Sequence, residues 1–219
     1  MAEFAILNEG DELINRVVPD YSIILDTIVL LLPAPNGGNL KILDLGAGSG
    51  RISEVIHREL PAADLTLLDI SDEMLAVAKR RLDDVRAAFV TGDYTSAELE
   101  TGFDVIVASL TLHHLPDPQK RDVFVRLYSA LADGGSLVIS DIVLGSTPYW
   151  SDSYEELWLE AIQNVPEEQR THILKHYREH DIPASVADQL AWLSDVGFID
   201  VACHWRRLNF AVYGGRKVP

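Results

Sequence analysis

The sequence is poor in cysteine and in basic residues. Its 219 residues include one cysteine, Cys203, which excludes an internal disulfide or a thiolate cluster and fits a reducing cytosol. Lys and Arg total 18 against 34 Asp and Glu, a net charge of −16. Nucleic acids and anionic membranes attract basic faces, so we expect neither as a partner. A neutral or cationic small molecule fits this charge better.

Long apolar runs are also missing. The most apolar early run, residues 23–32, is interrupted by Asp26 and Thr27 and ends at Pro33. No basic stretch precedes it, so we expect neither a targeting signal nor a membrane helix. These absences predict a cytoplasmic protein, and they leave a homodimer open.

What is present is an alternation of β-rich apolar runs with stretches of helical periodicity, which indicates an α/β fold with a mostly parallel sheet. We expect seven strands, at 41–44, 64–69, 87–91, 103–109, 135–142, 198–205 and 208–213. We expect helices at 52–59, 72–83, 119–132 and 186–196. The last two strands are separated only by Arg206 and Arg207, which predicts an antiparallel hairpin. The expected architecture is therefore a Rossmann-like seven-stranded sheet.

Two segments lie outside this alternation. The first, residues 1–33, is expected to be helical and has an apolar stripe of Ile23, Ile24, Ile28, Leu31 and Leu32. The second, residues 144–184, is a mostly helical insertion. Since open parallel sheets bind ligands beyond the carboxyl ends of their strands, segments added there can form a lid or simply cap the core. We divide the single domain into an N-terminal lid (1–33), a core (34–143), a helical insertion that caps the acceptor (144–184), and a last helix with the hairpin (185–219).

The most specific motif is a glycine turn after the first strand. It runs Asp44-Leu45-Gly46-Ala47-Gly48-Ser49-Gly50. Glycines there permit positive φ and close approach of the backbone to a ligand. A dinucleotide fingerprint would need glycine where Arg51 stands, and a P-loop would need a Gly-Lys-Ser/Thr sequence. Asp44 can hold the turn or meet the ammonium group of a ligand.

Polar residues also follow the next three strands. Asp69 ends the second strand, where a carboxylate can bind both hydroxyls of a ribose. Asp93 and Tyr94 follow the third strand, and the segment from Ser109 to His114 follows the fourth. Because the carboxyl ends of parallel strands meet at one edge, these residues predict a nucleoside-sized site.

Together these motifs resemble class I S-adenosylmethionine-dependent methyltransferases over about residues 40–143. The resemblance implies S-adenosylmethionine as cofactor and S-adenosylhomocysteine as product. It places the glycine turn around the methionyl group, Asp69 on the ribose, Asp93 and Tyr94 near the adenine, and Ser109 under the sulfonium. The implied cofactor-binding residues are Arg16, Tyr21, Asp44, Gly46, Ala47, Gly48, Gly50, Asp69, Ile70, Met74, Asp93, Tyr94, Ser109 and Leu110.

Within this fold the sequence is also similar to carboxy-S-adenosylmethionine synthase. The similarity covers 16–22, the Thr111-Leu112 pair, and 186–198 with the hairpin. It implies that Tyr21 lies over the cofactor and that Arg16 helps to place the N-terminal lid. It also implies a basic residue in the insertion that binds the added carboxylate. The basic residues there are Arg170, Lys175 and Arg178.

Histidines are the candidates for catalysis. Methyl transfer chiefly needs an aligned nucleophile, but an acceptor can still need to lose a proton. His113 and His114 follow the fourth strand, near the expected methyl group, and one of the two should face the core. His172, His176 and His180 recur every fourth residue, yet no H-E-x-x-H motif is present, and we expect no metal.

The insertion carries aromatic and acidic residues. Tyr149, Trp150, Tyr154 and Trp158 are most simply core residues, although one or two can line an acceptor pocket. Six carboxylates lie between 152 and 168 and would favour an amine if they faced that pocket. We therefore expect a methyltransferase acting on a small molecule. A carboxy-S-adenosylmethionine synthase, a cofactor-binding protein without transfer activity and, least favoured, a nicotinamide oxidoreductase remain alternatives.

Overall fold

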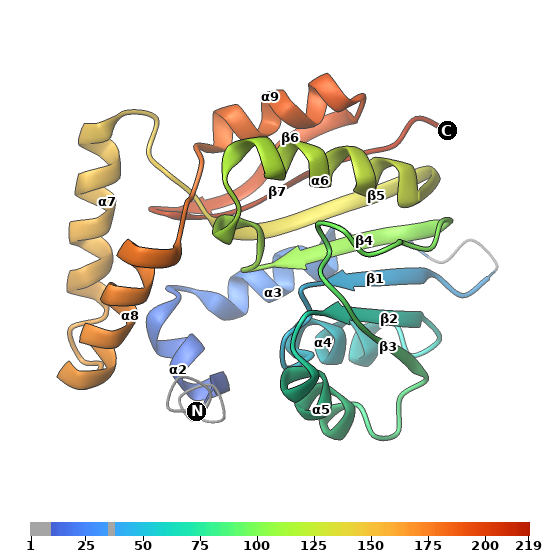
Figure 1. Cartoon of the computed structure of the whole chain (residues 1–219), viewed down its shortest axis with the longest axis horizontal. Helices are drawn as coiled ribbons and strands as arrows, with labels where there is room; N and C mark the ends of the chain where they lie inside the picture. The colour runs from blue at the N-terminus through green and yellow to red at the C-terminus, as the bar shows by residue number, and fades with distance from the viewer. Residues whose placement is uncertain (1–9, 35–37) are drawn as a thin grey trace.

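A seven-stranded mixed sheet organises the protein (Figure 1). The computed structural model describes residues 10–34 and 38–219. The strand order is β3-β2-β1-β4-β5-β7-β6. The strands are β1 Lys41–Leu45, β2 Asp64–Asp69, β3 Ala87–Thr91, β4 Phe103–Ser109, β5 Leu131–Ile142, β6 Ile199–Arg207 and β7 Phe210–Arg216. The predicted Rossmann-like fold is confirmed.

Strand direction follows the sequence pattern. β1 to β5 pair in parallel, and the apolar runs of β1, β2, β4 and β5 are mostly buried because helices cover both faces. β3 lies at the edge of the sheet, and its Val90 is 43% exposed. β7 is antiparallel to both β5 and β6. The hairpin was correctly predicted, but its turn was not. Arg206 and Arg207 belong to β6, and the chain reverses at Leu208 and Asn209, where Leu208 has a φ of 52°.

Two hydrophobic clusters fill the two sides of the sheet. One packs α3 Tyr21–Leu30, α4 Arg51–Glu59 and α5 Asp72–Arg81 against one face. The other packs α6 Asp117–Ala130 and α9 Val186–Val196 against the opposite face. Helix α6 begins two residues before the predicted start, with Pro118 in its first turn, where a missing N–H costs nothing.

The N-terminal segment has two different roles. Residues 1–9 of the predicted lid lie outside the described residues. Helix α3 is part of the core, and it buries Tyr21, Ile24, Leu25 and Ile28. The predicted stripe was wrong at Ile23, which is 44% exposed. The shorter helix α2, Gly10–Val17, precedes it and reaches the carboxyl edge of the sheet.

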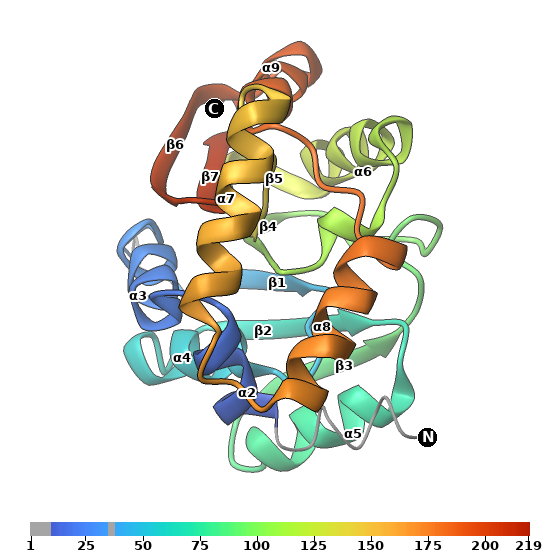
Figure 2. The same ribbon diagram turned by 90° about the vertical axis from the view of Figure 1, so that its left-hand side faces the viewer.

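The insertion crosses that same edge. It contains α7, Pro148–Ala161, and α8, Glu167–His180. Figure 2 shows both helices lying across the ends of the parallel strands, on the side where α2 also lies. Trp158 joins these elements because its Nε1 donates to the Val17 carbonyl oxygen at 2.7 Å. No described helix has the length and apolar content needed to span a membrane.

Candidate active site

A small cavity of about 180 Å³ lies over the glycine turn. It brings together these predicted residues: Tyr21, Asp44, Gly46, Ala47, Gly48, Met74, Ser109 and Leu110. It also includes Ile14, Ser49, Arg51 and Ile52, which were not predicted. Ser49, Arg51 and Ile52 continue the turn into α4, so their place follows from the motif. Ile14 comes from α2, and only its position in an apolar group with Leu13, Val17 and Val18 could have signalled it.

Two glycines of the turn, Gly46 and Gly50, have different structural roles. Gly46 has a φ of +67°, and a Cβ atom there would lie 2.0 Å from Thr111 Oγ1, so the turn and the loop after β4 need glycine to come this close. Gly50 starts α4 with a φ of +75°. A Cβ atom on Gly50 would lie 2.9 Å from that of Ala78, so this glycine allows helix packing and lies outside the cavity lining.

Asp69 ties the glycine turn to the start of α5. Its Oδ2 accepts a hydrogen bond from Gly48 N at 2.7 Å, and its Oδ1 accepts one from Ser71 N at 2.9 Å. Ser71 in turn caps α5 by accepting from Met74 N. Asp69 is thus placed at the end of β2 as the sequence predicts, and it fixes the conformation of two loops that border the cavity.

Asp44 is a buried acid on the cavity wall. It is 2% exposed, and its Oδ2 accepts a hydrogen bond from Ser53 Oγ at 2.6 Å. Burial raises the pKa of Asp44 to about 7, the Ser53 hydrogen bond offsets part of that shift, and the nearby Asp69 charge adds to it. A cationic group placed beside Asp44 would therefore favour loss of its proton.

The remaining predicted cofactor residues lie outside the lining of this cavity. Arg16 is on the exposed side of α2, where it pairs with Glu12. Ile70 is 68% exposed. Asp93 accepts hydrogen bonds from the backbone and hydroxyl of Thr95, which lower its pKa. Tyr94 Oη donates to the Thr111 carbonyl oxygen at 3.1 Å and so links the ends of β3 and β4.

A second, larger cavity of about 560 Å³ adjoins the first. Its walls are mostly apolar and come from α2, the end of β4, α7, α8 and the hairpin. The apolar side chains are Leu13, Ile14, Val17, Val18, Leu110, Ile142, Trp158, Ile173, Tyr177 and Phe210. Ile14 and Leu110 line both cavities. Leu110 has a φ of 52°, an uncommon conformation for a leucine and one that is concentrated at functional sites.

Histidines form one end of the larger cavity. Five of the seven histidines line it: His113, His114, His172, His176 and His180. His113 and His114 are the last two residues of a 3-10 turn, Leu112–His114, which follows β4. His113 is buried, as expected for one of the pair, whereas 42% of the His114 side chain is exposed. The α8 histidines therefore lie against a cavity, although their stripe alone suggested a solvated face.

Two aspartates accompany these histidines. Asp141, from β5, contacts His113 Nδ1 through Oδ1 at 2.5 Å. Burial acts to lower the pKa of His113, but the charge and the hydrogen bond of Asp141 outweigh it, so that pKa is raised. Asp181 follows α8 and faces His113, His114 and His176. Sequence reasoning missed both aspartates, because neither belongs to a local motif.

The insertion contributes less charge to the cavity than the sequence allowed. The six carboxylates from Asp152 to Glu168 do not line it, and the carboxylate that does is Asp181. Among the four aromatic residues, Trp158 lines the cavity and packs against Tyr177 and Phe210. Tyr149 and Trp150 are 68% and 45% exposed. The cavity wall is therefore built from one face of the insertion.

Comparisons with known proteins agree with this geometry. Residues 42–135 match a family model described as a methyltransferase domain. A carboxy-S-adenosyl-L-methionine synthase of Chromohalobacter salexigens is 30% identical over 91% of this chain and 77% of its own. The corresponding synthase of Campylobacter hominis is 25% identical over 94% of this chain and 90% of its own.

A solved structure shares the fold over the whole chain. An O-methyltransferase family 2 protein from Planctomyces limnophilus, crystallised with apigenin, superposes with a TM-score of 0.71 at 20% identity. It covers 99% of this chain, which spans only 61% of that structure. Other methyltransferase structures of this fold are also longer, and the chain spans little more than half of them.

Proposed function

Because the chain belongs to the class I S-adenosylmethionine-dependent methyltransferase family, we propose that it transfers the methyl group of S-adenosylmethionine to a hydroxyl or amino group of a small, largely apolar acceptor. The observation that carries this proposal is the junction of the two cavities at Ile14 and Leu110. A cofactor in the smaller cavity and an acceptor in the larger one would meet at that junction. Such alignment of the reacting atoms is the protein's main contribution to methyl transfer.

In this proposal the glycine turn holds the methionyl end of the cofactor. The backbone of Gly46 and Gly48 can approach the ligand closely, and the Asp44 carboxylate receives its ammonium group. Asp69 supports this arrangement by fixing Gly48 and Ser71, and it offers its remaining lone pairs to the ribose hydroxyls. S-adenosylmethionine supplies the electrophilic methyl group.

The larger cavity takes the acceptor. Its apolar walls desolvate the body of the acceptor, and its histidines provide polar contacts at one end, which is the usual composition of small-molecule sites. His114, which is partly exposed, can receive the proton that the acceptor loses, and His113 is held in place by Asp141. The larger cavity, with a volume of about 560 Å³, can hold a small molecule that contains a ring.

Calorimetry with S-adenosylhomocysteine tests the cofactor half of the proposal. We expect the wild-type protein to bind one equivalent and Asp69→Ala to bind at least about 30-fold more weakly, since both loops lose their shared acceptor. The matched control is Asp122→Ala, which removes an exposed carboxylate from α6. Undiminished binding by Asp69→Ala would contradict the site assignment.

Carboxy-S-adenosylmethionine synthesis is the second candidate, because two such synthases align along most of this chain. The insertion does not favour it. Arg178 pairs with Glu155, Arg170 donates to the Gln163 carbonyl oxygen, and Lys175 pairs with Glu179. None of these three lines either cavity, so the insertion brings no lysine or arginine to either cavity to bind an added carboxylate.

The mass of a nucleoside co-purified with the protein separates the two reactions, because only the synthase yields a carboxylated cofactor. The acceptor half needs a turnover assay with labelled S-adenosylmethionine and a panel of apolar phenols and amines. We expect methyl transfer to a member of that panel. Binding of the cofactor without transfer to any of them would instead favour a non-catalytic binding protein.

A further inference from the structure

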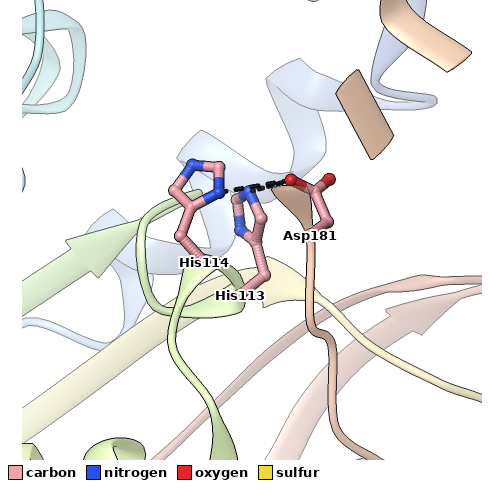
Figure 3. A group of neighbouring side chains, drawn as sticks. All are labelled: His113, His114 and Asp181. Atoms are coloured by element: carbon pink, nitrogen blue, oxygen red, sulfur yellow. Dashed lines mark ion pairs between the residues drawn. The ribbon is translucent and has the colours of Figure 1, made fainter. Parts of the chain in front are cut away.

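The carboxylate of Asp181 lies in an unusual position. Its side chain is 4% exposed, and its Oδ1 accepts no hydrogen bond from the described residues. Yet three imidazole nitrogens surround that oxygen, at 3.7 Å from His113 Nε2, 3.2 Å from His114 Nδ1 and 3.6 Å from His176 Nε2. Figure 3 shows His113 and His114 both directed toward Asp181. A buried carboxylate oxygen without a hydrogen bond needs another partner.

These separations are those of ligands that share one ion. Zinc binds imidazole nitrogen and carboxylate oxygen at about 2.0–2.2 Å, so neighbouring ligand atoms of a tetrahedral site lie about 3.4 Å apart. The donor atoms of His113, His114 and Asp181 all lie within 4.8 Å of one another. His176 lies outside this group of three, although its Nε2 is 3.6 Å from Asp181 Oδ1. With His176 added, the set would be the three nitrogens and one oxygen that divalent transition metals accept.

A further carboxylate orients one of the ligands. His113 Nδ1 is bonded to Asp141 Oδ1 at 2.5 Å, which leaves Nε2 free to present its lone pair toward Asp181. Metal-binding histidines usually donate their other ring N–H to a carboxylate or carbonyl in this way. Asp141 is 2% exposed, so this orientation is built into the core.

The backbone also holds the ligand-bearing segments together. Ile182 N donates to the His113 carbonyl oxygen at 2.6 Å. The buried Lys120 Nζ donates to the carbonyl oxygens of Leu115 and Ile182, each at 2.5 Å. These contacts therefore hold the loop after β4 and the segment after α8 at the separation that His113, His114 and Asp181 need to share an ion.

From these contacts we propose that His113 Nε2, His114 Nδ1, Asp181 Oδ1 and His176 Nε2 bind one divalent transition-metal ion, with Zn²⁺ as the probe; the first three form the preassembled group, and His176 completes the set from its place 3.6 Å from Asp181 Oδ1. This proposal departs from the expectation of no metal, which rested on the absence of an H-E-x-x-H motif among the histidines of one helix. An ion there joins the insertion to the core and uses the His114 lone pair that would otherwise receive the acceptor's proton. In the metal-loaded protein the wall of the larger cavity therefore carries a Lewis acid in place of that base. Metal binding can be measured without an acceptor, so its test is independent of the proposed methyl transfer.

The experiment is a Zn²⁺ titration of the full chain after treatment with a chelator, followed by competition with a chromophoric chelator. We expect one ion per chain with a Kd on the order of 1 µM or tighter. Replacing Zn²⁺ by Co²⁺ should give the intense visible absorption of a four-coordinate ion. Because His113 is buried, the ligand variants are His114→Ala and Asp181→Asn, and each should weaken binding by more than about 100-fold.

Two further variants separate this site from simpler alternatives. Asp141→Asn should weaken binding by about 10–100-fold while leaving one site per chain, because it acts through His113. The double variant His172→Ala/His180→Ala should retain the wild-type Kd, since these side chains are not ligands in the proposal. The control His204→Ala removes an exposed histidine from β6.

Unfolding curves without metal show whether each variant is folded. Absence of stoichiometric binding at 100-fold excess over that Kd would overturn the proposal. So would wild-type affinity in a folded Asp181→Asn variant, or loss of binding confined to the α8 double variant. Failure of S-adenosylhomocysteine to bind would instead count only against the proposed function.

Discussion

The two cavities that meet at Leu110 are built in different ways. The smaller one is centred on a single glycine turn, 46–49, with the start of α4, the ends of β1 and β4, and single residues from α2, α3 and α5 around it. The larger one is lined by residues from α2, the loop after β4, the end of β5, α7, α8 and β7, which are distant in the sequence. The smaller cavity therefore depends more on the local conformation of one turn, and the larger cavity depends more on how separate elements pack.

The largest expected effect tests the smaller cavity, which depends on the glycine turn. Gly46→Ala places a Cβ atom 2.0 Å from Thr111 Oγ1 at a φ of +67°. We expect the free energy of unfolding to fall by about 3 kcal/mol or more, and S-adenosylhomocysteine binding to be lost. Urea unfolding and calorimetry measure both.

Gly102→Ala is the control for that substitution, because Gly102 has a φ of +83° and no neighbour within 4 Å of the added atom. In Gly102→Ala the free energy of unfolding should fall only by the conformational strain of a positive φ, about 1–2 kcal/mol, and cofactor binding should be unchanged. Equal losses in the two variants would show that close packing against Thr111 is unimportant.

The next prediction tests the larger cavity, which depends on how separate elements pack. Lys120→Met removes the hydrogen bonds from Nζ to the carbonyl oxygens of Leu115 and Ile182, which join the loop after β4 to the segment after α8, and a longer one to Asp117 Oδ1. We expect a loss of about 2–3 kcal/mol in unfolding free energy, with the affinity for S-adenosylhomocysteine unchanged within twofold below the unfolding transition. Lys175→Met, an exposed substitution on α8, should change stability by less than about 0.5 kcal/mol. A loss of cofactor affinity in Lys120→Met that accompanies its loss of stability would mean that the two cavities are not independent.

The third prediction concerns the charge of Asp44. The pKa of this buried acid is raised to about 7, and binding of the cofactor's ammonium group requires the ionised form. Affinity for S-adenosylhomocysteine should therefore fall about tenfold between pH 8 and pH 6. Calorimetry in buffers of different ionisation enthalpy should detect proton release near pH 6. Asp44→Asn should abolish this pH dependence, and a wild-type affinity that is flat from pH 6 to 8 would contradict the role of Asp44.

The same shift predicts a stability effect of defined sign. The folded-state pKa lies above the unfolded value of 3.8, so the contribution of Asp44 is fully present below about pH 4 and is lost as the pH rises to about 7. Asp44→Asn should therefore gain stability relative to the wild type across this interval. Parallel unfolding curves of the two proteins at pH 5 and pH 8 measure the difference.

The smallest effect is expected from Trp158→Phe. It removes the hydrogen bond from Nε1 to the Val17 carbonyl oxygen and should cost about 1 kcal/mol in unfolding free energy. We expect acceptor turnover to change while S-adenosylhomocysteine affinity does not. A loss of cofactor affinity as large as that of Gly46→Ala would remove the distinction between the two cavities.

The same distinction explains what the sequence could predict. The seven strands and the turn from Asp44 to Gly50 follow from local periodicity and glycine chemistry, and the strand ends bring Ser109 and Leu110 to the same edge. Ile14 and Asp181 could not be placed, because their positions depend on how α2 and α8 cross that edge. The hairpin turn was misplaced because the charged Arg206 and Arg207 suggested a loop, whereas Leu208 and Asn209 form it.

The central claim is that the cofactor's methyl group lies where the two cavities meet. It can be tested by nuclear Overhauser contacts between bound S-adenosylmethionine, labelled with ¹³C in its methyl group, and assigned side-chain methyls of the protein. We predict contacts from the sulfonium methyl to Leu110 and Ile14 and none to Ile70, which is exposed outside the cavity. Contacts to Ile70 without any to Leu110 or Ile14 would contradict the claim.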